Sequence, residues 1–408
     1  MRISIACKQF APSGGAESFL ASLVRRLRAE GVQVRILTPD ARAAAAEAPA
    51  AAEAPAAAEA AGAAEAAGAE GVQIVPLALP RVPRAFRDLA LARAARAALA
   101  REDAEVTFSD QKCWGADVVR PGGGVQREYV RQRQRSYRGL PARAFNRLSR
   151  ALSVRERLRI HIDDRLYAPP GPRCIIANSD MVRREIARHY PAMAARVQVV
   201  YNGADCARLH PALRREHRPR VRAELRLPPD ALVGVFVGHD WRRKGLFTFI
   251  EAVGILARKD APQPVYALVV GRGRERTARA FADRCGAADR MRFVGAVAPA
   301  PYYAAADLLV LPSYYDPCAN VTMEGLACGL PALTSLHNGA YELLTPGQSG
   351  LYLRDPSDSA QLAGFLEHYM DAPTLEAGSR AARALALEYT QEHQLGEIVR
   401  ILAEVARR

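Results

Sequence analysis

Short apolar runs alternate with amphipathic helical segments along almost the whole of this chain, and this order leaves few folds open. Residues 2–7 form an apolar run typical of a buried strand, and a glycine-bearing loop leads to apolar side chains at helical spacing between Phe19 and Leu27. Gly31 ends that helix, and residues 32–38 predict a second strand. Strand, helix and strand in this order indicate a parallel sheet covered by helices on both faces.

The same alternation occurs twice, which predicts two domains. A chain of 408 residues is longer than one hydrophobic core usually serves. In the first series we expect strands at 2–7, 32–38, 72–77, 105–109 and 173–178. In the second series we expect strands at 232–238, 265–271, 291–294, 307–311 and 331–334. The fold class is therefore α/β, with two doubly wound Rossmann-like domains at 1–203 and 204–389, a ligand cleft between them, and a C-terminal helix at 390–408 that joins the first domain.

Residues 41–70 interrupt the first domain with a low-complexity insertion. The segment consists almost wholly of Ala, Glu, Pro and Gly, and glutamates recur at every sixth position from Glu47 to Glu65. This period does not match the helical turn, so the glutamates circle the helix axis and no apolar face forms. Pro49 and Pro55 interrupt any long helix. We interpret the insertion as a mobile segment that carries no chemistry.

The basic charge is concentrated in one segment. The chain has a net charge of +14, and 13 arginines between Arg120 and Arg165 are accompanied by only four acidic residues. Either this segment is a solvated helical face, or it faces an anionic partner such as a membrane leaflet, a phosphorylated glycolipid or nucleic acid. The local concentration of charge favours the anionic partner.

Cysteine spacing and hydropathy indicate a cytoplasmic protein. The seven cysteines are scattered and include no Cys-x-x-Cys pair, which favours reduced, structural thiols over a disulfide framework or a zinc cluster. No apolar run approaches the ~20 residues that span a bilayer, and the first residues lack the pattern of a signal peptide. We expect a cytoplasmic chain whose mature form begins at or near Met1.

The most informative motif lies between residues 315 and 331, directly after an expected strand. Asp316 and Glu324 are eight residues apart, and a helix beginning near Ala319 would direct free N–H groups toward the preceding loop, as in anion sites. Asp316 before Pro317 is also typical of a helix N-cap. Glu324 lies among apolar residues and needs a polar partner, for which a sugar diol is suitable.

This motif resembles that of glycosyltransferase family 4, whose members are retaining enzymes of GT-B fold. The family has Glu-x7-Glu after a strand of its C-terminal domain, and this chain has Asp-x7-Glu. The resemblance implies that Glu324 binds the donor ribose and that Asp316 contacts the donor sugar. It also implies that the backbone N–H groups of Ala319, Asn320 and Val321 bind the diphosphate.

Two further segments resemble the donor site of the family. Arg243 and Lys244 end a turn after an expected strand, and the resemblance implies that they stabilise the leaving nucleotide. Cations near a helix start oppose the helix macrodipole, so helix stability does not explain them. Gly14 and Gly15 lie between the first strand and the first helix, and the resemblance places them beside the donor phosphates. Alone, two glycines would mark only a tight turn.

The segment before the arginine-rich region resembles the corresponding stretch of the lipopolysaccharide-core heptose glucosyltransferases. Lys112 and Asp117 match that stretch, whereas Gln111 replaces an asparagine. Asp117 either orients an acceptor hydroxyl or caps a turn. The glycine loop at 120–124 follows and is suited to acceptor entry. Residues 199–205, at the expected domain junction, either match a family segment or form only a hinge turn.

The resemblance implies the retaining transfer of a hexose, with UDP-glucose as the donor, to a hydroxyl of a glycan or lipopolysaccharide-type acceptor. No Asp-x-Asp motif occurs, so we expect basic side chains rather than a divalent metal to bind the diphosphate, and we expect no cofactor. A role in lipopolysaccharide-core or related surface-polysaccharide synthesis would bring peripheral contact with the anionic cytoplasmic face of the inner membrane.

Two other functions fit part of the sequence. A sugar-nucleotide epimerase of the same fold would keep the donor cleft but would need no separate acceptor. A nucleic-acid or anionic-surface binding protein would explain the basic charge, but the chain has no helix-turn-helix, RNA-recognition or zinc signature and only 7% aromatic residues.

Overall fold

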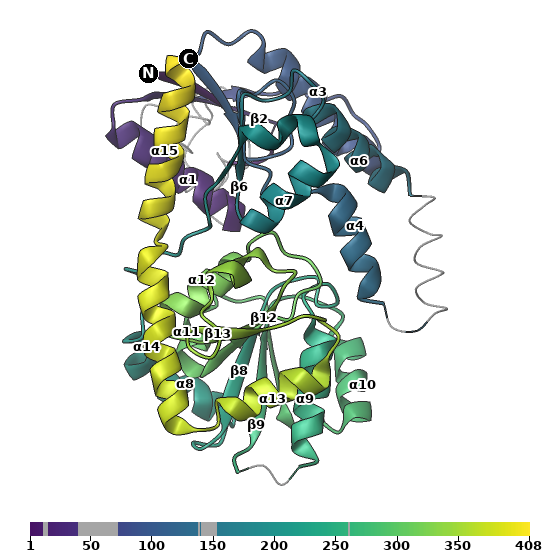
Figure 1. Cartoon of the computed structure of the whole chain (residues 1–408), viewed down its shortest axis with the longest axis vertical. Helices are drawn as coiled ribbons and strands as arrows, with labels where there is room; N and C mark the ends of the chain where they lie inside the picture. The colour runs from purple at the N-terminus through teal and green to yellow at the C-terminus, as the bar shows by residue number, and fades with distance from the viewer. Residues whose placement is uncertain (11–14, 40–71, 138, 140–152, 260–261) are drawn as a thin grey trace, which may run out of the picture. The chain divides into compact units, whose positions relative to one another are not determined.

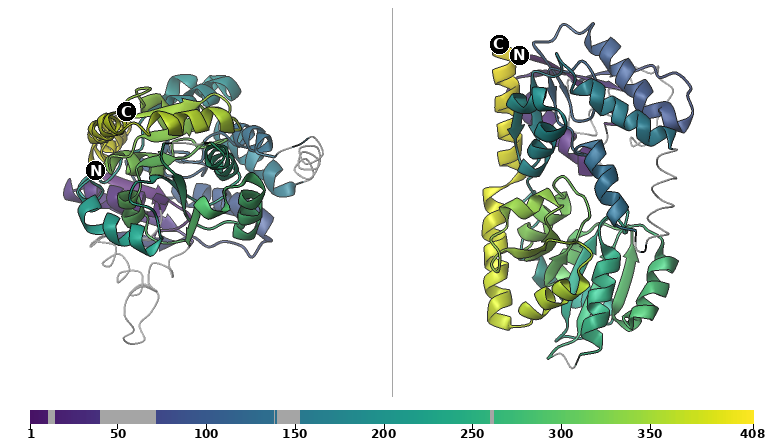
Figure 2. Two further views of the ribbon diagram at one scale, coloured as in Figure 1. Left: turned by 90° about the horizontal axis from the view of Figure 1, so that it is seen from below. Right: turned by 45° about the vertical axis from the view of Figure 1, so that its right-hand side comes forward.

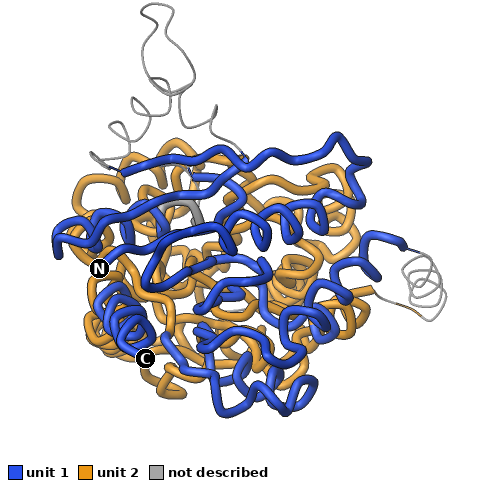
Figure 3. The backbone as a smooth tube through the Cα atoms, turned by 90° about the horizontal axis from the view of Figure 1, so that it is seen from above, with its two compact units in different colours: residues 1–128, 147–200, 395–408 blue, residues 129–146, 201–394 orange. Residues whose placement is uncertain are grey.

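The computed structural model describes residues 1–10, 15–39, 72–137, 139, 153–259 and 262–408 (Figures 1 and 2). The insertion expected at 41–70 lies outside these residues. The chain divides into two compact units, which have different colours in Figure 3. Unit 1 comprises residues 1–128, 147–200 and 395–408, and unit 2 comprises residues 129–146 and 201–394. The boundaries between the units at 200/201 and 394/395 lie close to the expected domain ends at 203 and 389. Residues 129–146, expected in the first domain, group instead with unit 2.

The described part of unit 1 contains a seven-stranded parallel sheet in the order β3-β2-β1-β4-β5-β6-β7. The register sets Ile3 of β1 opposite Val34 of β2 and Val106 of β4, so apolar side chains of neighbouring strands share a face of the sheet. The strands are β1 (Arg2–Ala6), β2 (Gln33–Thr38), β3 (Gln73–Pro76), β4 (Val106–Ser109), β5 (Val118–Val119), β6 (Cys174–Ala177) and β7 (Val197–Val199).

Helices cover both faces of this sheet, as expected for a doubly wound domain. On one face Leu20 of α1 and Leu402 of α15 are buried in the same core, and Figures 1 and 2 show these two helices side by side. On the other face α3, α6 and α7 bury Leu91, Ile162 and Ile186. The described helices that belong wholly or partly to unit 1 are α1 (Gly15–Ala29), α3 (Arg87–Leu99), α4 (Gln126–Arg135), α6 (Val154–Leu166), α7 (Asp180–His189) and α15 (Gln391–Arg407), with 3₁₀ turns η1 (Arg84–Phe86) and η2 (Pro191–Arg196).

The described part of unit 2 contains a six-stranded parallel sheet in the order β10-β9-β8-β11-β12-β13. The chain passes from β8 through β9 to β10 at one edge and then returns to β11, on the other side of β8. Such a reversal is a topological switch point, and open α/β sheets bind ligands beside the carboxyl ends of the strands there. The strands are β8 (Leu232–Val237), β9 (Val265–Val270), β10 (Met291–Gly295), β11 (Leu308–Val310), β12 (Ala332–Ser335) and β13 (Gly350–Leu353).

Two apolar cores lie on the two faces of the second sheet. Phe249 of α9 and Leu362 of α13 belong to one core, and Met323 of α12 and Ala382 of α14 belong to the other. The described helices are α8 (Leu213–Glu224), α9 (Leu246–Ala257), α10 (Glu275–Cys285), α11 (Ala300–Ala305), α12 (Asn320–Ala327), α13 (Ser359–His368) and α14 (Ala372–Glu388), with 3₁₀ turns η3 (Ala288–Arg290) and η4 (Gly339–Leu343).

The strands expected from the sequence are confirmed to within one residue at each end, and so is the terminal helix. The sequence did not predict β5, β7 and β13, which have only two to four residues each. Length explains only β5, because two residues have no measurable period, whereas β3, β4, β6, β11 and β12 are as short as β7 or β13 and were predicted. Among the described helices, none combines the length and the apolar character needed to cross a membrane.

Candidate functional site

The turn after β8 places two cations at the start of α9. Gly245, which precedes α9, has a φ of +84°, and a Cβ added there would lie 2.0 Å from the carbonyl oxygen of Pro312. Gly238 has a φ of +149°, and a Cβ added there would lie 2.5 Å from Cδ of Lys244. Both positions therefore need glycine. The turn that they permit carries Arg243 and Lys244.

Arg243 and Lys244 converge on Asp316, which follows β11. Arg243 Nη1 lies 3.5 Å from Asp316 Oδ2, and Lys244 Nζ lies 3.3 Å from the same oxygen. The three side chains are only 16%, 13% and 12% exposed. Little water surrounds these charges, so removal of Asp316 would leave two cations without their shared partner, whereas removal of one cation leaves the other beside Asp316. The structure thus brings three of the predicted site residues together at the switch point of unit 2.

Two further contacts hold the Arg243 guanidinium. Its Nε lies 3.3 Å from Asp240 Oδ2, and its Nη1 donates a hydrogen bond to the carbonyl oxygen of Tyr315. Burial alone would lower the pKa of Arg243, but the carboxylates of Asp316 and Asp240 raise it above its ordinary value. Arg243 is therefore a fixed positive charge with a defined orientation.

The start of α12 offers two of the three backbone groups that the sequence predicted. The Ala319 N–H donates a hydrogen bond to Asn338 Oδ1 at 3.1 Å, so it is already engaged. Among the described residues, none accepts a hydrogen bond from the N–H of Asn320 or Val321. Such open N–H groups are usual in the first turn of a helix. The Ala319 N–H thus holds the turn before the helix, and its predicted contact with the diphosphate would require it to leave or share this acceptor.

Asn338 fixes this turn, and the sequence did not single it out. Its side chain is fully buried, its Oδ1 accepts hydrogen bonds from the N–H groups of Ala319 and Ala340, and its Nδ2 donates to the hydroxyls of Thr322 and Thr334. One amide therefore ties the start of α12 to β12. An asparagine after a strand is an ordinary turn residue. Only the folded structure, which brings Ala319 and Thr322 beside Asn338, reveals this role.

Glu324 lies inside α12, and its carboxylate has a polar partner. Oε2 accepts a hydrogen bond from the Tyr303 hydroxyl at 2.7 Å. Burial raises the pKa of Glu324, and the hydrogen bond from Tyr303 and the charges of Arg208 and Lys244 oppose this rise. Among the described residues, none donates a hydrogen bond to the second oxygen, Oε1. Glu324 thus keeps one oxygen available, while Tyr303, which the sequence did not predict, orients the other.

Asn202 supports the same loop from the segment that the sequence predicted as either a family match or a hinge turn. Its Nδ2 donates hydrogen bonds to the carbonyl oxygen of Cys318 at 2.7 Å and to Asn320 Oδ1 at 2.6 Å. Its Oδ1 accepts a hydrogen bond from Gln394 Nε2 at 3.3 Å. Asn202 is 5% exposed, so these contacts satisfy a buried amide and hold both the residue before the N-cap and the first residue of α12.

The Asp117 carboxylate has partners within unit 1. Its Oδ2 accepts hydrogen bonds from the N–H and the hydroxyl of Thr107, at 3.0 and 2.7 Å, and its Oδ1 lies 3.8 Å from Arg173. Asp117 precedes β5, so it lies at the amino ends of the strands. Parallel sheets bind ligands at the carboxyl ends. Asp117 therefore links β4 to β5, which fits the turn-capping alternative, and its role toward an acceptor stays a prediction.

Lys112 also has a structural role. Its Nζ lies 2.7 Å from Oδ1 of Asp163, which is fully buried. Oδ2 of Asp163 accepts a hydrogen bond from the Gln126 N–H at 2.8 Å, at the start of α4. The other residues predicted in the first half are Gly14, which lies outside the described residues, and Gly15, which is the first residue of α1.

The arginine-rich segment is not one solvated face. The Arg120 guanidinium lies 4.0 Å above the ring of Phe19, and the residue is 7% exposed. Arg127 pairs with Asp164 at 2.9 Å, and Arg159 pairs with Asp88 at 2.8 Å. Four arginines of the segment, at positions 138, 143, 147 and 150, lie outside the described residues. Part of the positive charge is therefore neutralised inside unit 1.

All seven cysteines are free thiols, as expected. Burial raises the pKa of Cys113 and of Cys328 to about 12, so these two stay protonated near neutral pH. Among the described residues, no group of three or more His, Cys, Asp and Glu side chains is placed to hold a metal ion.

Two family models match the chain. The model described as "Glycosyltransferase Family 4" matches residues 13–208, and the model described as "Glycosyl transferases group 1" matches residues 231–371. The first match covers most of unit 1, and the second covers the sheet of unit 2.

Curated relatives cover part of the chain. The D-inositol 3-phosphate glycosyltransferase of Streptomyces avermitilis is 33% identical over 222 residues, which are 51% of this chain and 47% of the relative. The enzyme of the same name from Rhodococcus opacus is 30% identical over 229 residues, which are 54% of this chain and 50% of the relative. The chain thus spans about half the length of the curated relatives it matches.

Solved structures match almost the whole chain. WaaG, a glycosyltransferase involved in lipopolysaccharide biosynthesis, has a TM-score of 0.74 at 20% identity, over 98% of this chain and 99% of that chain. Anabaena HepE in complex with UDP-glucose has a TM-score of 0.68 at 18% identity, over 98% of this chain and 99% of that chain. These likenesses show the fold. With two parallel-sheet units and both family matches, the chain belongs to the family 4 glycosyltransferases of GT-B fold.

Proposed function

We propose that this chain is a retaining hexosyltransferase that moves glucose from UDP-glucose to a hydroxyl group of a glycan or glycolipid. The observation that carries this proposal is the convergence of Arg243 and Lys244 on Asp316 at the switch point of unit 2. A nucleoside diphosphate brings ~2 negative charges, which two cations and the open N–H groups of a helix start complement. The HepE structure contains UDP-glucose, which supports this choice of donor.

The roles of Asn320, Val321 and Glu324 in donor binding follow from the geometry described above. Asn320 and Val321 donate their N–H groups to the diphosphate, because they begin α12 and are open. Glu324 accepts hydrogen bonds from the ribose hydroxyls through Oε1, because Tyr303 occupies Oε2. We assign Gly14 and Gly15 to the donor phosphates from the family resemblance.

Charge moves during the reaction in the direction that this site can stabilise. As the bond between the sugar and the diphosphate breaks, negative charge grows on the β-phosphate and the sugar gains oxocarbenium character. Arg243 and Lys244 are already oriented by Asp316 and Asp240, so their charges need no rearrangement at that moment. One preorganised donor of this kind contributes ~3 kcal/mol to lowering the barrier.

We propose that the acceptor hydroxyl attacks from the face that the diphosphate leaves, which retains the configuration. Asp316 is committed to two cations before the donor binds, so its role is to contact a donor-sugar hydroxyl rather than to form a covalent intermediate. A departing phosphate oxygen takes the acceptor proton. Arg243 and Lys244 supply the positive charge that a divalent metal supplies in other transferases, so we propose a metal-independent reaction with no cofactor.

For the acceptor we propose a lipopolysaccharide-core or related surface glycan, reached at the cytoplasmic face of the inner membrane. The role of WaaG in lipopolysaccharide biosynthesis and the net charge of +14 support this assignment. Liposomes with acidic lipids should retain the protein at low salt and release it at high salt. Equal retention on neutral liposomes would remove the membrane contact from the proposal.

Product analysis tests the reaction itself. The full chain is incubated with radiolabelled UDP-glucose and a truncated lipopolysaccharide acceptor, and the products are separated. We expect label in the acceptor, with retained anomeric configuration by NMR. Label in a different nucleotide sugar would show an epimerase, and unchanged UDP-glucose despite binding would show a binding protein. Either outcome contradicts the transferase proposal.

A further inference from the structure

Tyr303, in α11, is a buried tyrosine that takes no direct part in the proposed reaction. Its side chain is fully buried in the core that also contains Met323 and Leu326 of α12. Among the described residues, the Glu324 carboxylate is the one acceptor that the Tyr303 hydroxyl contacts, at 2.7 Å. A phenylalanine would fill the same apolar space, so packing alone does not explain the hydroxyl.

The Tyr303 hydroxyl is a hydrogen-bond donor that keeps its proton. Burial, and then the charge of the Glu324 carboxylate, raise the pKa of Tyr303 well above its ordinary value. A hydroxyl that donates to a carboxylate makes a stronger hydrogen bond than a neutral pair does. The 2.7 Å contact therefore limits the rotation of the Glu324 carboxylate about the last bond of its side chain, which is otherwise loosely restricted.

Helix α11, which carries Tyr303, is itself held at its C-terminal end. It packs against α8 (Figure 1), and Arg218 of α8 donates hydrogen bonds to the carbonyl oxygens of Ala305 and Ala306, at 3.2 and 3.1 Å. Arg222 of α8 donates to the Ala305 carbonyl oxygen at 3.0 Å. Carbonyl groups at a helix end lack partners within the helix, and the two arginines supply these partners. The position of α11 is therefore fixed by α8.

Asp307 fixes the same two arginines. Its Oδ1 accepts a hydrogen bond from Arg218 and its Oδ2 accepts one from Arg222, both at 2.7 Å. Oδ2 also accepts a hydrogen bond from the N–H of Val233, in β8, at 2.9 Å. Because Asp307 is buried and its charge is shared by two cations, these contacts tie α8 and α11 to the second sheet. The Tyr303 hydroxyl thus approaches Glu324 from an anchored helix.

We propose that Tyr303 is a positioning residue for recognition of the donor ribose. The inference rests on the proposed function, which assigns the ribose hydroxyls to Glu324. Tyr303 occupies Oε2, and it thereby sets the plane of the carboxylate and leaves Oε1 to the ribose hydroxyls. It acts through Glu324 and does not touch the nucleotide. A nucleotide without these hydroxyls gains nothing from an oriented carboxylate, so Tyr303 increases the preference of the site for a ribonucleotide.

Calorimetric titration of the full chain with UDP and with 2′,3′-dideoxy-UDP tests the inference. The variant is Tyr303→Phe, which keeps the ring and removes the hydroxyl, and the control is Tyr302→Phe, at a partly buried tyrosine of the same helix. We expect the unchanged chain to bind UDP at least ~10-fold more tightly than the dideoxy form. Tyr303→Phe should bind UDP ~5-fold more weakly and the dideoxy form equally well. Tyr302→Phe should keep the full preference.

The two nucleotides separate a positioning role from a structural one. A loss of affinity that both nucleotides share equally in Tyr303→Phe, or an unchanged preference for UDP, would overturn the inference. If Tyr303→Phe does not fold, Glu324→Ala is compared with Tyr303→Phe/Glu324→Ala, in which no carboxylate is left without its partner. These two variants should show the same low preference, and a further loss in the double variant would contradict action through Glu324. Failure of the unchanged chain to bind UDP would instead contradict the proposed function.

Discussion

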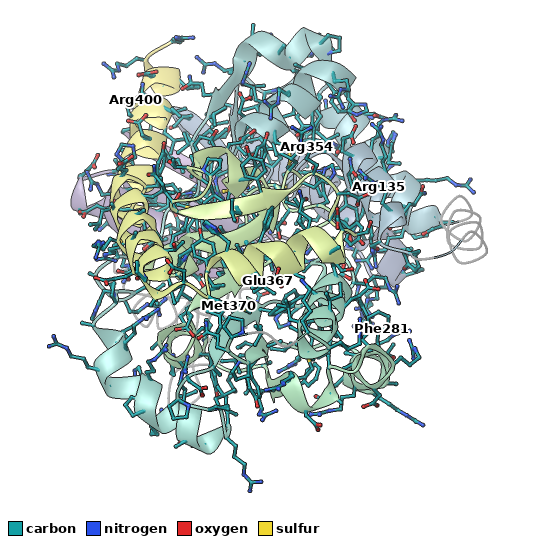
Figure 4. The ribbon with its side chains drawn as sticks, turned by 60° about the horizontal axis from the view of Figure 1, so that its bottom comes forward. Arg135, Phe281, Arg354, Glu367, Met370 and Arg400 are labelled. Carbon is teal, nitrogen blue, oxygen red and sulfur yellow. The ribbon has the colours of Figure 1, made fainter. Side chains whose placement is uncertain are left out.

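Lys244 is nearly buried and pairs with Asp316. The stability of the fold does not depend on the Lys244 charge, because Arg243 contacts the same carboxylate. We expect Lys244→Ala to lower turnover at least ~100-fold, because it removes one preorganised charge from the leaving diphosphate, and to change the melting temperature little. The control is Lys259→Ala. Lys259 is half exposed and pairs with Glu367, labelled in Figure 4, at 2.6 Å. Near-unchanged turnover in Lys244→Ala would refute its role.

Glu324 is proposed to bind the donor ribose, and its raised pKa also makes the free energy of unfolding depend on pH. Burial raises its pKa, so between the ordinary value of 4.5 and the raised value the folded chain binds more protons than the unfolded chain. Protonated Glu324 contributes to the free energy of unfolding. This contribution is full below pH 4.5 and is lost as the pH rises through the raised pKa of Glu324 in the folded chain. Glu324→Gln keeps an acceptor for Tyr303 but does not titrate.

We therefore expect the unfolding free energy of Glu324→Gln to fall less than that of the unchanged chain as the pH rises above 4.5. UDP affinity should fall at the same time, since the ribose loses a carboxylate. Urea unfolding at several pH values measures the first effect. Glu376→Gln, in an exposed pair with Arg380, serves as the control. Equal pH slopes in Glu324→Gln and the unchanged chain would contradict the assignment.

The start of α12 depends on one buried amide. Asn338→Ala removes four hydrogen bonds and leaves the Ala319 N–H without its acceptor, so we expect a loss of ~2–4 kcal/mol in unfolding free energy. UDP affinity should also fall, because Asn320 and Val321 lose a fixed position. Denaturant titration measures the first effect and calorimetry the second. A loss under ~0.5 kcal/mol would show that the turn holds without Asn338.

The turn before α9 depends on the absence of a side chain. Gly245→Ala would place a Cβ 2.0 Å from the Pro312 carbonyl oxygen at a φ of +84°, so we expect a loss above ~2 kcal/mol in unfolding free energy and lower turnover. Gly364→Ala, in α13, is the matched control, because its added Cβ meets nothing within 4 Å. That change should be neutral or stabilising. Equal effects of the two substitutions would contradict the proposed strain.

Local sequence patterns predicted most of the elements, and they also indicated the residues that we propose for donor binding. The βαβ order, the Asp-x7-Glu spacing and the cation pair are contained in single segments, so Asp316, Glu324, Arg243 and Lys244 could be found without a structure. Asp117 could not be judged in this way, because its role depends on which end of the sheet it occupies.

The sequence also did not predict the residues that orient the proposed site residues. Asn338 and Tyr303 act through contacts with segments that lie apart in the chain, and an isolated asparagine or tyrosine carries no pattern. Two-residue β5 shows the same limit for a whole element, because its conformation comes from pairing with β4 and β6. The features that the sequence patterns did not predict therefore depend on hydrogen bonds between residues that lie far apart in the chain.

Over the whole molecule, each unit contains a group of basic side chains. Unit 2 gathers Arg243 and Lys244 at its switch point, and the side chains that line a cavity in unit 1 include five cations. We propose that part of the net charge of +14 serves to bind the diphosphate of the donor. If the protein supplies this charge itself, a chelator should leave the rate of glucosyl transfer unchanged, and abolition of transfer by EDTA would contradict the metal-independent mechanism.

The central claim is that Arg243, Lys244 and the start of α12 bind a nucleoside diphosphate without a divalent metal. Calorimetric titration of UDP in the presence of EDTA tests it, with Arg243→Gln/Lys244→Gln compared with Lys259→Gln. Two charge-assisted contacts are lost in the double variant, so we predict at least a ~100-fold loss of UDP affinity. Lys259→Gln should bind UDP as the unchanged chain does. Undiminished binding by the double variant, or no binding by the unchanged chain until a metal is added, would contradict the claim.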